Sequence, residues 1–139
     1  MNSIKQEVRI EAAIAQVFEA LSTEAGYRGW WNQRAEVPTA PGGEAKLYFL
    51  KDGNPVNMRF RIDDTTLNRH VRWTCTAHDM PSWVGTTLDR QLKAEGNTVL
   101  VSFEHAGWKD AAPEPVAQGW RHFLGSLKAY VERGSGEPW

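Results

Sequence analysis

The sequence has a single cysteine, no long apolar run and no excess of charge of either sign. Cys75 has no partner within the chain, which excludes an internal disulfide framework and indicates a reducing compartment. Sixteen lysines and arginines are balanced by 17 aspartates and glutamates, and this argues against nucleic-acid binding, which needs a basic excess. No segment is long and apolar enough to span a bilayer, and the charged start is no signal peptide. We therefore expect a soluble cytoplasmic domain with no nucleic-acid partner and no membrane insertion.

Motifs for metals, phosphates and nucleophilic catalysis are also lacking. The four histidines show no paired ligand spacing: His70, His78, His105 and His122. Neither a glycine-rich phosphate loop nor a Gly-x-Ser-x-Gly elbow is present, and no catalytic triad is recognisable. We expect no metal and no cofactor.

Tryptophan, by contrast, is abundant in a chain of 139 residues. This length suits one domain, which we predict to span residues 1–139. Seven indole rings serve cores, interfaces and aromatic pockets alike: Trp30, Trp31, Trp73, Trp83, Trp108, Trp120 and Trp139. Their places along the chain, rather than their number, indicate what they do.

The first third of the chain changes from strand to helix periodicity. Residues 4–10 alternate between apolar and polar side chains, as in a half-buried strand. Residues 12–21 then space apolar side chains as a helix does. Thr23 and Glu24 predict the cap and acidic first turn of a second short helix that ends near Trp30.

The rest of the chain predicts a sheet followed by one long helix. Alternating segments between residues 45 and 105 are joined by links too short for crossover helices, so the strands are antiparallel. Residues 116–131 form one apolar stripe over about five turns, and Gly134 is a suitable C-cap. The order predicts an α+β fold in which the sheet wraps around the terminal helix.

Four stretches of the chain resemble a known family: 10–12 running into 17–21, Trp30-Trp31 after Thr23-Glu24, 105–108, and 119–138. In their order and spacing the sequence is similar to the SRPBCC, or START-like, superfamily. Within this superfamily, the chain resembles the family of homologues of the activator of heat-shock protein 90 ATPase. The resemblance is to the C-terminal domain of that activator. The resemblance extends over nearly the whole chain.

This resemblance implies a helix-grip fold: a curved antiparallel sheet around a long C-terminal helix, two short helices after the first strand, and an elongated internal cavity. Members of the superfamily bind lipids, sterols, polyketides or other apolar molecules there, and some catalyse reactions. The full activator resembles this chain only in its C-terminal part, so we do not expect a chaperone partner. Fold alone does not fix function.

The inward-facing side chains predict a ligand site between the sheet and the last helix. Its expected lining is aromatic and apolar with polar anchors: Phe49, Met58, Phe60, Trp73, Leu88, Arg90, Phe103, His105, Trp120, Phe123 and Leu124. Trp30 and Trp31 are adjacent and diverge on a helix end, so we expect one to pack and Trp31 to form a lip of the cavity mouth. Trp83 follows a Pro-Ser pair and is expected at the mouth as well, as a gate or a dimer contact.

Arg90 and His105 are the two candidate catalytic or anchoring residues. Arg90 shares the parity of apolar neighbours, so its guanidinium points inward as an anchor for a carboxylate, phosphate or phenolate. The alternatives are an internal ion pair with Glu36 or Glu19, snorkelling at the rim, or a bulge that turns the side chain outward. His105 has a pKa suited to proton transfer, or it is structural and bonded to a nearby carbonyl.

The function we predict is binding of a small hydrophobic, lipid-like or aromatic, molecule by a monomer or weak homodimer. The first alternative is an enzyme of the polyketide cyclase or dehydratase kind, without cofactor. There Arg90 would polarise a carbonyl and His105 would move a proton. The second alternative is a chaperone-linked interaction module.

Overall fold

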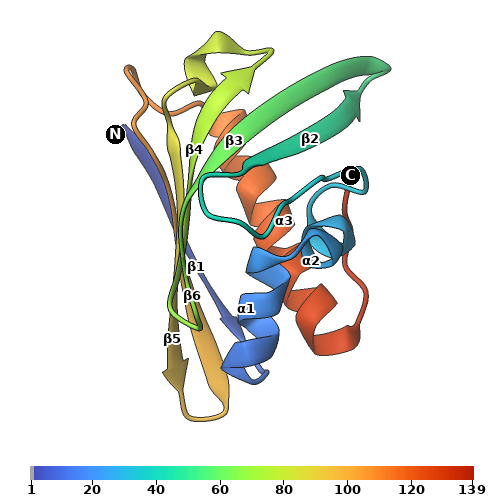
Figure 1. Ribbon diagram of the computed structural model, residues 1–139, viewed down its shortest axis with the longest axis vertical. Coiled ribbons are helices and arrows are strands. Elements are labelled where there is room, and N and C mark those ends of the chain that lie inside the picture. The colour runs from blue at the N-terminus through green and yellow to red at the C-terminus, as the bar shows by residue number, and fades with distance from the viewer. Residues whose placement is uncertain (1) are drawn as a thin grey trace.

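Helices cover one face of a curved antiparallel sheet, and the other face is exposed (Figure 1). The computed structural model describes residues 2–139. In this part of the chain the elements follow in this order: β1 (Ser3–Ile10), α1 (Ile14–Ser22), α2 (Glu24–Trp30), β2 (Glu44–Lys51), β3 (Asn54–Thr66), β4 (His70–His78), the 3-10 turn η1 (Pro81–Trp83), β5 (Thr87–Glu95), β6 (Thr98–Ala106) and α3 (Glu114–Arg133). The predicted α+β helix-grip architecture is confirmed.

The strands are ordered β1-β6-β5-β4-β3-β2, so the first strand pairs with the last. All other neighbours are consecutive antiparallel strands, as short links require. At the β2–β3 turn Asp52 and Gly53 both adopt positive φ, of 52° and 81°, which is the backbone of a type I′ hairpin turn.

The free edge of β2 is covered by the segment that follows α2. The side-chain amide of Asn32 makes the two hydrogen bonds that a neighbouring strand would make there. Its Oδ1 accepts from the Tyr48 N–H (3.0 Å), and its Nδ2 donates to the Tyr48 carbonyl (2.7 Å). Glu36 and Lys46 exchange a further pair of backbone hydrogen bonds. Edge strands with unpaired backbone groups invite pairing with other chains, and this cover occupies two positions of the edge.

Helix α3 lies across the concave face of the sheet (Figure 1). Its apolar stripe is buried at Trp120, Phe123, Leu124 and Leu127, as the sequence predicted. Gly134 ends the helix with a φ of 85°, a left-handed conformation that glycine adopts at little cost.

Beyond α3 the chain folds back along the helix toward α2. The Ser126 hydroxyl donates to the Trp30 carbonyl (2.7 Å) and accepts from the Glu137 N–H (2.6 Å). The Trp139 N–H donates to the Trp31 carbonyl (2.9 Å). These bonds fasten the last residues to the C-terminal end of α2, beside the interior.

Candidate functional site

The eleven predicted lining residues lie together on the concave side of the sheet. Each is 7% exposed or less: Phe49, Met58, Phe60, Trp73, Leu88, Arg90, Phe103, His105, Trp120, Phe123 and Leu124. Strands contribute eight of these side chains by alternation, and α3 contributes three by helical spacing. The sequence therefore identified one spatial group, and its aromatic members are packed ring against ring.

Trp31 lies at the centre of this group and not at a cavity mouth, so that prediction was wrong. It is 2% exposed, and its ring centroid is 5.1 Å from Trp120 and 6.3 Å from Trp73. The helix α2 ends at Trp30, as predicted, but Trp31, its C-cap residue with a φ of −111°, does not diverge from Trp30 as expected. The two rings stack at 5.9 Å with 17° between their planes, and both are buried. The Trp31 ring therefore contacts both Trp73 and Trp120.

Trp83 was also wrongly placed at the mouth, since only 7% of it is exposed. Its ring stacks on His78 at 4.4 Å and contacts His105 and Trp108 at 4.7 and 5.7 Å. The Met80 N–H donates to His78 Nδ1, which leaves the proton of the neutral ring on Nε2. That Nε2 and the indole N–H groups of Trp83 and Trp108 have no protein acceptor in the described chain. Burial lowers the pKa of His78 to about 4.

His105 is fully buried in a hydrogen-bond chain that uses both of its ring nitrogens. The Trp120 indole N–H donates to Nδ1 (3.0 Å), so neutral His105 carries its proton on Nε2 and donates to the Thr86 hydroxyl (2.9 Å). That hydroxyl donates to the Trp83 carbonyl (2.6 Å). Burial lowers the pKa of His105 to about 3. The geometry is that of the structural alternative, in which the ring is held toward a carbonyl through one hydroxyl.

Arg90 points inward, as the alternation of β5 predicted, and is 1% exposed. Its Nη1 donates to the Tyr27 hydroxyl (3.0 Å), and Nη2 and Nε donate to the carbonyls of Leu88 and Val71 at 3.4 Å each. The guanidinium carbon lies 4.6 Å from the centroid of Trp73, within range of a cation–π contact.

The carboxylates expected as alternatives for this contact are elsewhere. Glu19 and Glu36 are both exposed, because each faces outward from its own segment. The sequence reasoning missed the actual partner, Tyr27. No local pattern relates Tyr27 to Arg90, since the two residues are 63 positions apart in the chain.

The Tyr27 hydroxyl joins Arg90 to helix α1. It accepts from the guanidinium and donates to the Leu21 carbonyl. Burial raises the pKa of Tyr27 to about 12, which outweighs the opposing effect of the neighbouring positive charge. The phenol is therefore neutral at physiological pH and gives Arg90 a dipole and not a counter-charge.

An opening of about 200 Å³ leads to this region between the α1–α2 junction, the segment after α2, and strands β3 and β4. Its lining is mostly apolar with a rim of hydroxyl groups: Phe18, Ser22, Thr23, Val37, Pro38, Thr39, Ile62, Thr65, Val71 and Trp73. Of the eleven predicted lining residues, Trp73 borders this opening. The opening therefore lies at one end of the aromatic group, whereas the family resemblance implied an elongated cavity between the sheet and the last helix.

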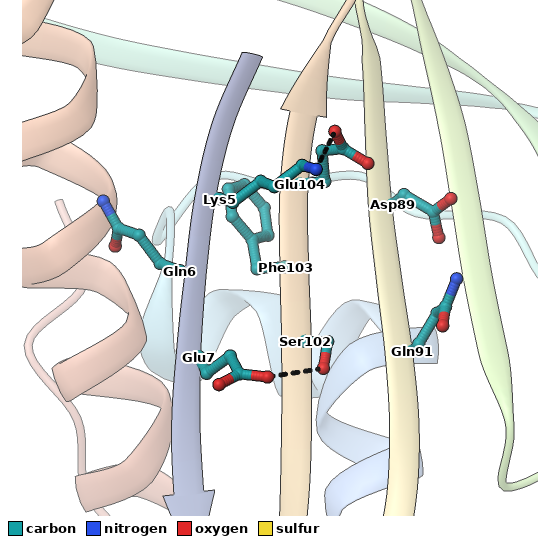
Figure 2. Close-up of a pocket in the computed structure, with 8 residues that line it drawn as sticks. All are labelled: Lys5, Gln6, Glu7, Asp89, Gln91, Ser102, Phe103 and Glu104. Carbon is teal, nitrogen blue, oxygen red and sulfur yellow. Dashed lines mark hydrogen bonds and ion pairs between the residues drawn. The ribbon is translucent and has the colours of Figure 1, made fainter.

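A larger hollow of about 460 Å³ lies on the outer face of the sheet (Figure 2). Its exposed side chains are charged or polar: Lys5 pairs with Glu104 at 3.9 Å, and the Ser102 hydroxyl donates to Glu7 at 3.3 Å. Gln6 is directed away, toward α3, where it donates to a backbone carbonyl. Charged and polar side chains dominate this surface, whereas the smaller opening has mostly apolar walls and suits a hydrophobic ligand better.

Two further observations bear on ligands and membranes. Within residues 2–139, no three histidine, cysteine or acidic side chains are grouped closely enough to hold a metal ion. None of the helices in the same residues combines the length and apolar character that crossing a bilayer requires.

Solved structures share this fold over nearly the whole chain. The Aha1 dimer from Colwellia psychrerythraea is 27% identical, with 98% of this chain and 100% of that one covered and a TM-score of 0.81. A protein from Chromobacterium violaceum is 22% identical over 94% and 97% of the two chains, with a TM-score of 0.83. A putative protein in the dynemicin biosynthetic locus is 19% identical over 98% of this chain and 49% of its own, with a TM-score of 0.76. No protein with a curated description matches the chain significantly.

The sequence itself matches a described family over most of its length. Residues 11–132 match the family "Activator of Hsp90 ATPase homolog 1-like protein". The match runs from the end of β1 to the last turn of α3, so it includes every element that forms the aromatic group and the opening. The chain therefore belongs to the Activator of Hsp90 ATPase homolog 1-like family, as its four resembling stretches predicted.

Proposed function

We propose that this protein binds a small, largely apolar molecule that enters through the opening between the α1–α2 junction and strands β3 and β4. The observation that carries the proposal is the opening itself, which has apolar walls, a hydroxyl rim and a floor of Val71 and Trp73. Pockets of this composition are typical of small-molecule sites. The aromatic side chains behind the floor extend the same apolar surface under α3.

The volume of the opening limits the size of the ligand. An apolar cavity of about 150 Å³ holds one benzene ring, so about 200 Å³ accommodates one ring with a short chain. A longer ligand needs the rings beneath α3 to move apart. Met58 lies among them, and its flexible thioether adapts to altered shapes.

One structural relative supports a small-molecule partner. The protein of the dynemicin biosynthetic locus, which shares the fold, is associated by its locus with the assembly of a small molecule. The superfamily resemblance implies lipid, sterol or polyketide ligands on the same side of the sheet. The lipid-like or aromatic nature of the ligand is our proposal for this chain.

Chemical-shift perturbation in a two-dimensional ¹H–¹⁵N NMR spectrum tests the proposal with a panel of single-ring and short-chain hydrophobic compounds. We expect shifts at the amides of Ser22, Thr23 and Thr39, which line the opening. The Thr39→Trp variant fills the mouth and abolishes these shifts. Ala40→Trp is the matched control, since Ala40 is exposed and adjacent but does not line the opening. Shifts confined to the outer sheet face, or none with any compound, would contradict the proposal.

The cyclase or dehydratase alternative gains no support from the site. It requires His105 to move a proton, and both nitrogens of that ring are bonded within the core. No contact described above favours a chaperone-linked role either. We therefore retain ligand binding as the proposed function.

For the oligomeric state we propose a monomer or weak homodimer. The Colwellia relative is a dimer in solution. In this chain Asn32 and Glu36 cover two positions of the β2 edge, which weakens dimerisation through that strand. Light scattering after gel filtration tests the proposal, and a dimer that persists on extensive dilution would contradict it.

A further inference from the structure

The guanidinium of Arg90 is a buried charge that forms no ion pair within residues 2–139. Its hydrogen-bond partners are a phenol and two backbone carbonyls, all of them neutral. Asp89, the next residue along the chain, lies on the opposite face of the strand and contacts His70 there. Arginine stays protonated in proteins, and a buried ion without a paired opposite charge destabilises the fold unless other contacts compensate.

The hydrogen bonds of this guanidinium leave part of its capacity unused. Arginine has five N–H donors, and Arg90 uses three of them. Two of the three bonds are 3.4 Å long, beyond the usual 2.7–3.2 Å range of an N–H···O bond and therefore weak. A stronger acceptor can replace either carbonyl at little cost. Burial lowers the pKa of Arg90 from its ordinary value, and the nearby Tyr27 and Asp89 offset this shift only in part.

The same guanidinium lies directly behind the floor of the opening. Arg90 is the cross-strand partner of Val71, and its charged group lies against the ring of Trp73. Val71 and Trp73 are the floor residues. Arg90 itself does not line the opening, so a molecule that enters along the apolar walls reaches its guanidinium with the leading end once Val71 and Trp73 shift.

We infer that the ligand is an organic anion, a compact aromatic or short-chain carboxylate whose head group pairs with Arg90. This inference rests on the proposed function and adds the chemical class of the ligand. A carboxylate matches the planar guanidinium in geometry and supplies the missing charge. The apolar body then occupies the walls of the opening, and the hydroxyl rim faces the solvent.

Isothermal titration calorimetry with two matched probes tests the inference on the full chain. 3-Phenylpropanoate and 3-phenylpropan-1-ol have the same carbon skeleton and differ in the head group. We expect the wild-type protein to bind the carboxylate at least about tenfold more tightly, because charge-assisted hydrogen bonds are roughly twice as strong as neutral ones. Arg90→Lys keeps the charge but not the planar fork and retains part of the preference, whereas Arg90→Met has neither and loses it.

The outcomes separate this inference from the proposed function. Binding of neither probe overturns both. If the wild type binds the two probes equally, the opening remains a binding site, but the inference that the ligand has an anionic head group is overturned. A preference that persists in Arg90→Met also overturns it, because the charge would then act elsewhere. Circular dichroism establishes whether the variants fold. If Arg90→Met does not fold, the comparison of the two probes on the wild-type protein decides the inference by itself.

Discussion

His105 makes the stability of this protein depend on pH in a range where carboxylates contribute little. Its pKa is about 3 in the folded protein against an ordinary value of 6.5, because burial disfavours the charged ring. The unfolded chain therefore takes up the proton first as the pH falls. The contribution is complete above pH 6.5 and is lost progressively as the pH falls from 6.5 toward 3.

The size of the effect follows from the pKa difference. One pKa unit corresponds to about 1.4 kcal/mol, so lowering the pH from 7 to 5 reduces the free energy of unfolding by about 2 kcal/mol through His105 alone. Folding lowers the pKa of several carboxyl groups, whose contributions are lost only near and below their ordinary pKa of about 4: Asp63, Asp64, Asp79 and Glu132.

Urea unfolding at pH 7 and pH 5, followed by circular dichroism, measures the effect. The matched variant is His105→Gln, whose amide accepts from the Trp120 indole and donates to the Thr86 hydroxyl but does not titrate. We expect the wild type to lose about 2 kcal/mol more than the variant over this interval. His78 is present in both proteins, so its own titration cancels in the comparison. Equal losses would show that His105 does not remain neutral in the folded core, which would refute the reasoning.

Three further substitutions test the packing of the interior, each by the free energy of unfolding. Trp120→Phe removes a buried donor and leaves the His105 nitrogen that accepts from it without a partner. It should therefore lower the free energy of unfolding by about 1–3 kcal/mol more than Trp108→Phe, whose indole N–H has no acceptor in the described chain. Equal losses would contradict the hydrogen-bond chain. Gly26→Ala places a methyl 2.7 Å from the backbone of α1 and should destabilise, whereas Gly125→Ala meets nothing within 4 Å and should stabilise by about 0.5–1 kcal/mol; the opposite order would contradict the contact of α1 with α2. Asn32→Ala leaves backbone groups of the β2 edge unpaired and should cost about 2 kcal/mol, and a neutral effect would show that the edge needs no cover.

Local periodicity was sufficient to predict the elements and the inward direction of Arg90. Alternation in β5 and the stripe of α3 depend on neighbours within a few residues, and a buried face imposes both patterns on the sequence. The same patterns grouped the eleven buried side chains correctly. They do not show whether such side chains leave a cavity between them, because that depends on how rings from distant segments fill the space.

The errors concern contacts that only the tertiary structure creates. Trp31 is central because its ring packs against rings of distant segments, among them Trp73 of β4 and Trp120 of α3. Arg90 meets Tyr27 across 63 positions of the chain, and His105 meets Thr86 across 19. No local pattern specifies such pairs, although an uncompensated inward arginine signals that a polar partner must exist.

The aromatic rings beneath α3 should give the interior of this protein distinct ultraviolet spectroscopic signals. Stacked indoles as close as those of Trp30 and Trp31 couple their electronic transitions, so the far-ultraviolet spectrum should contain an exciton couplet superimposed on the backbone signal. Excitation also migrates from ring to ring through the chain of contacts from Trp73 by way of Trp31 to Trp120. A molecule that parts any of these rings would change both signals, and the protein therefore contains its own optical reporter of occupancy.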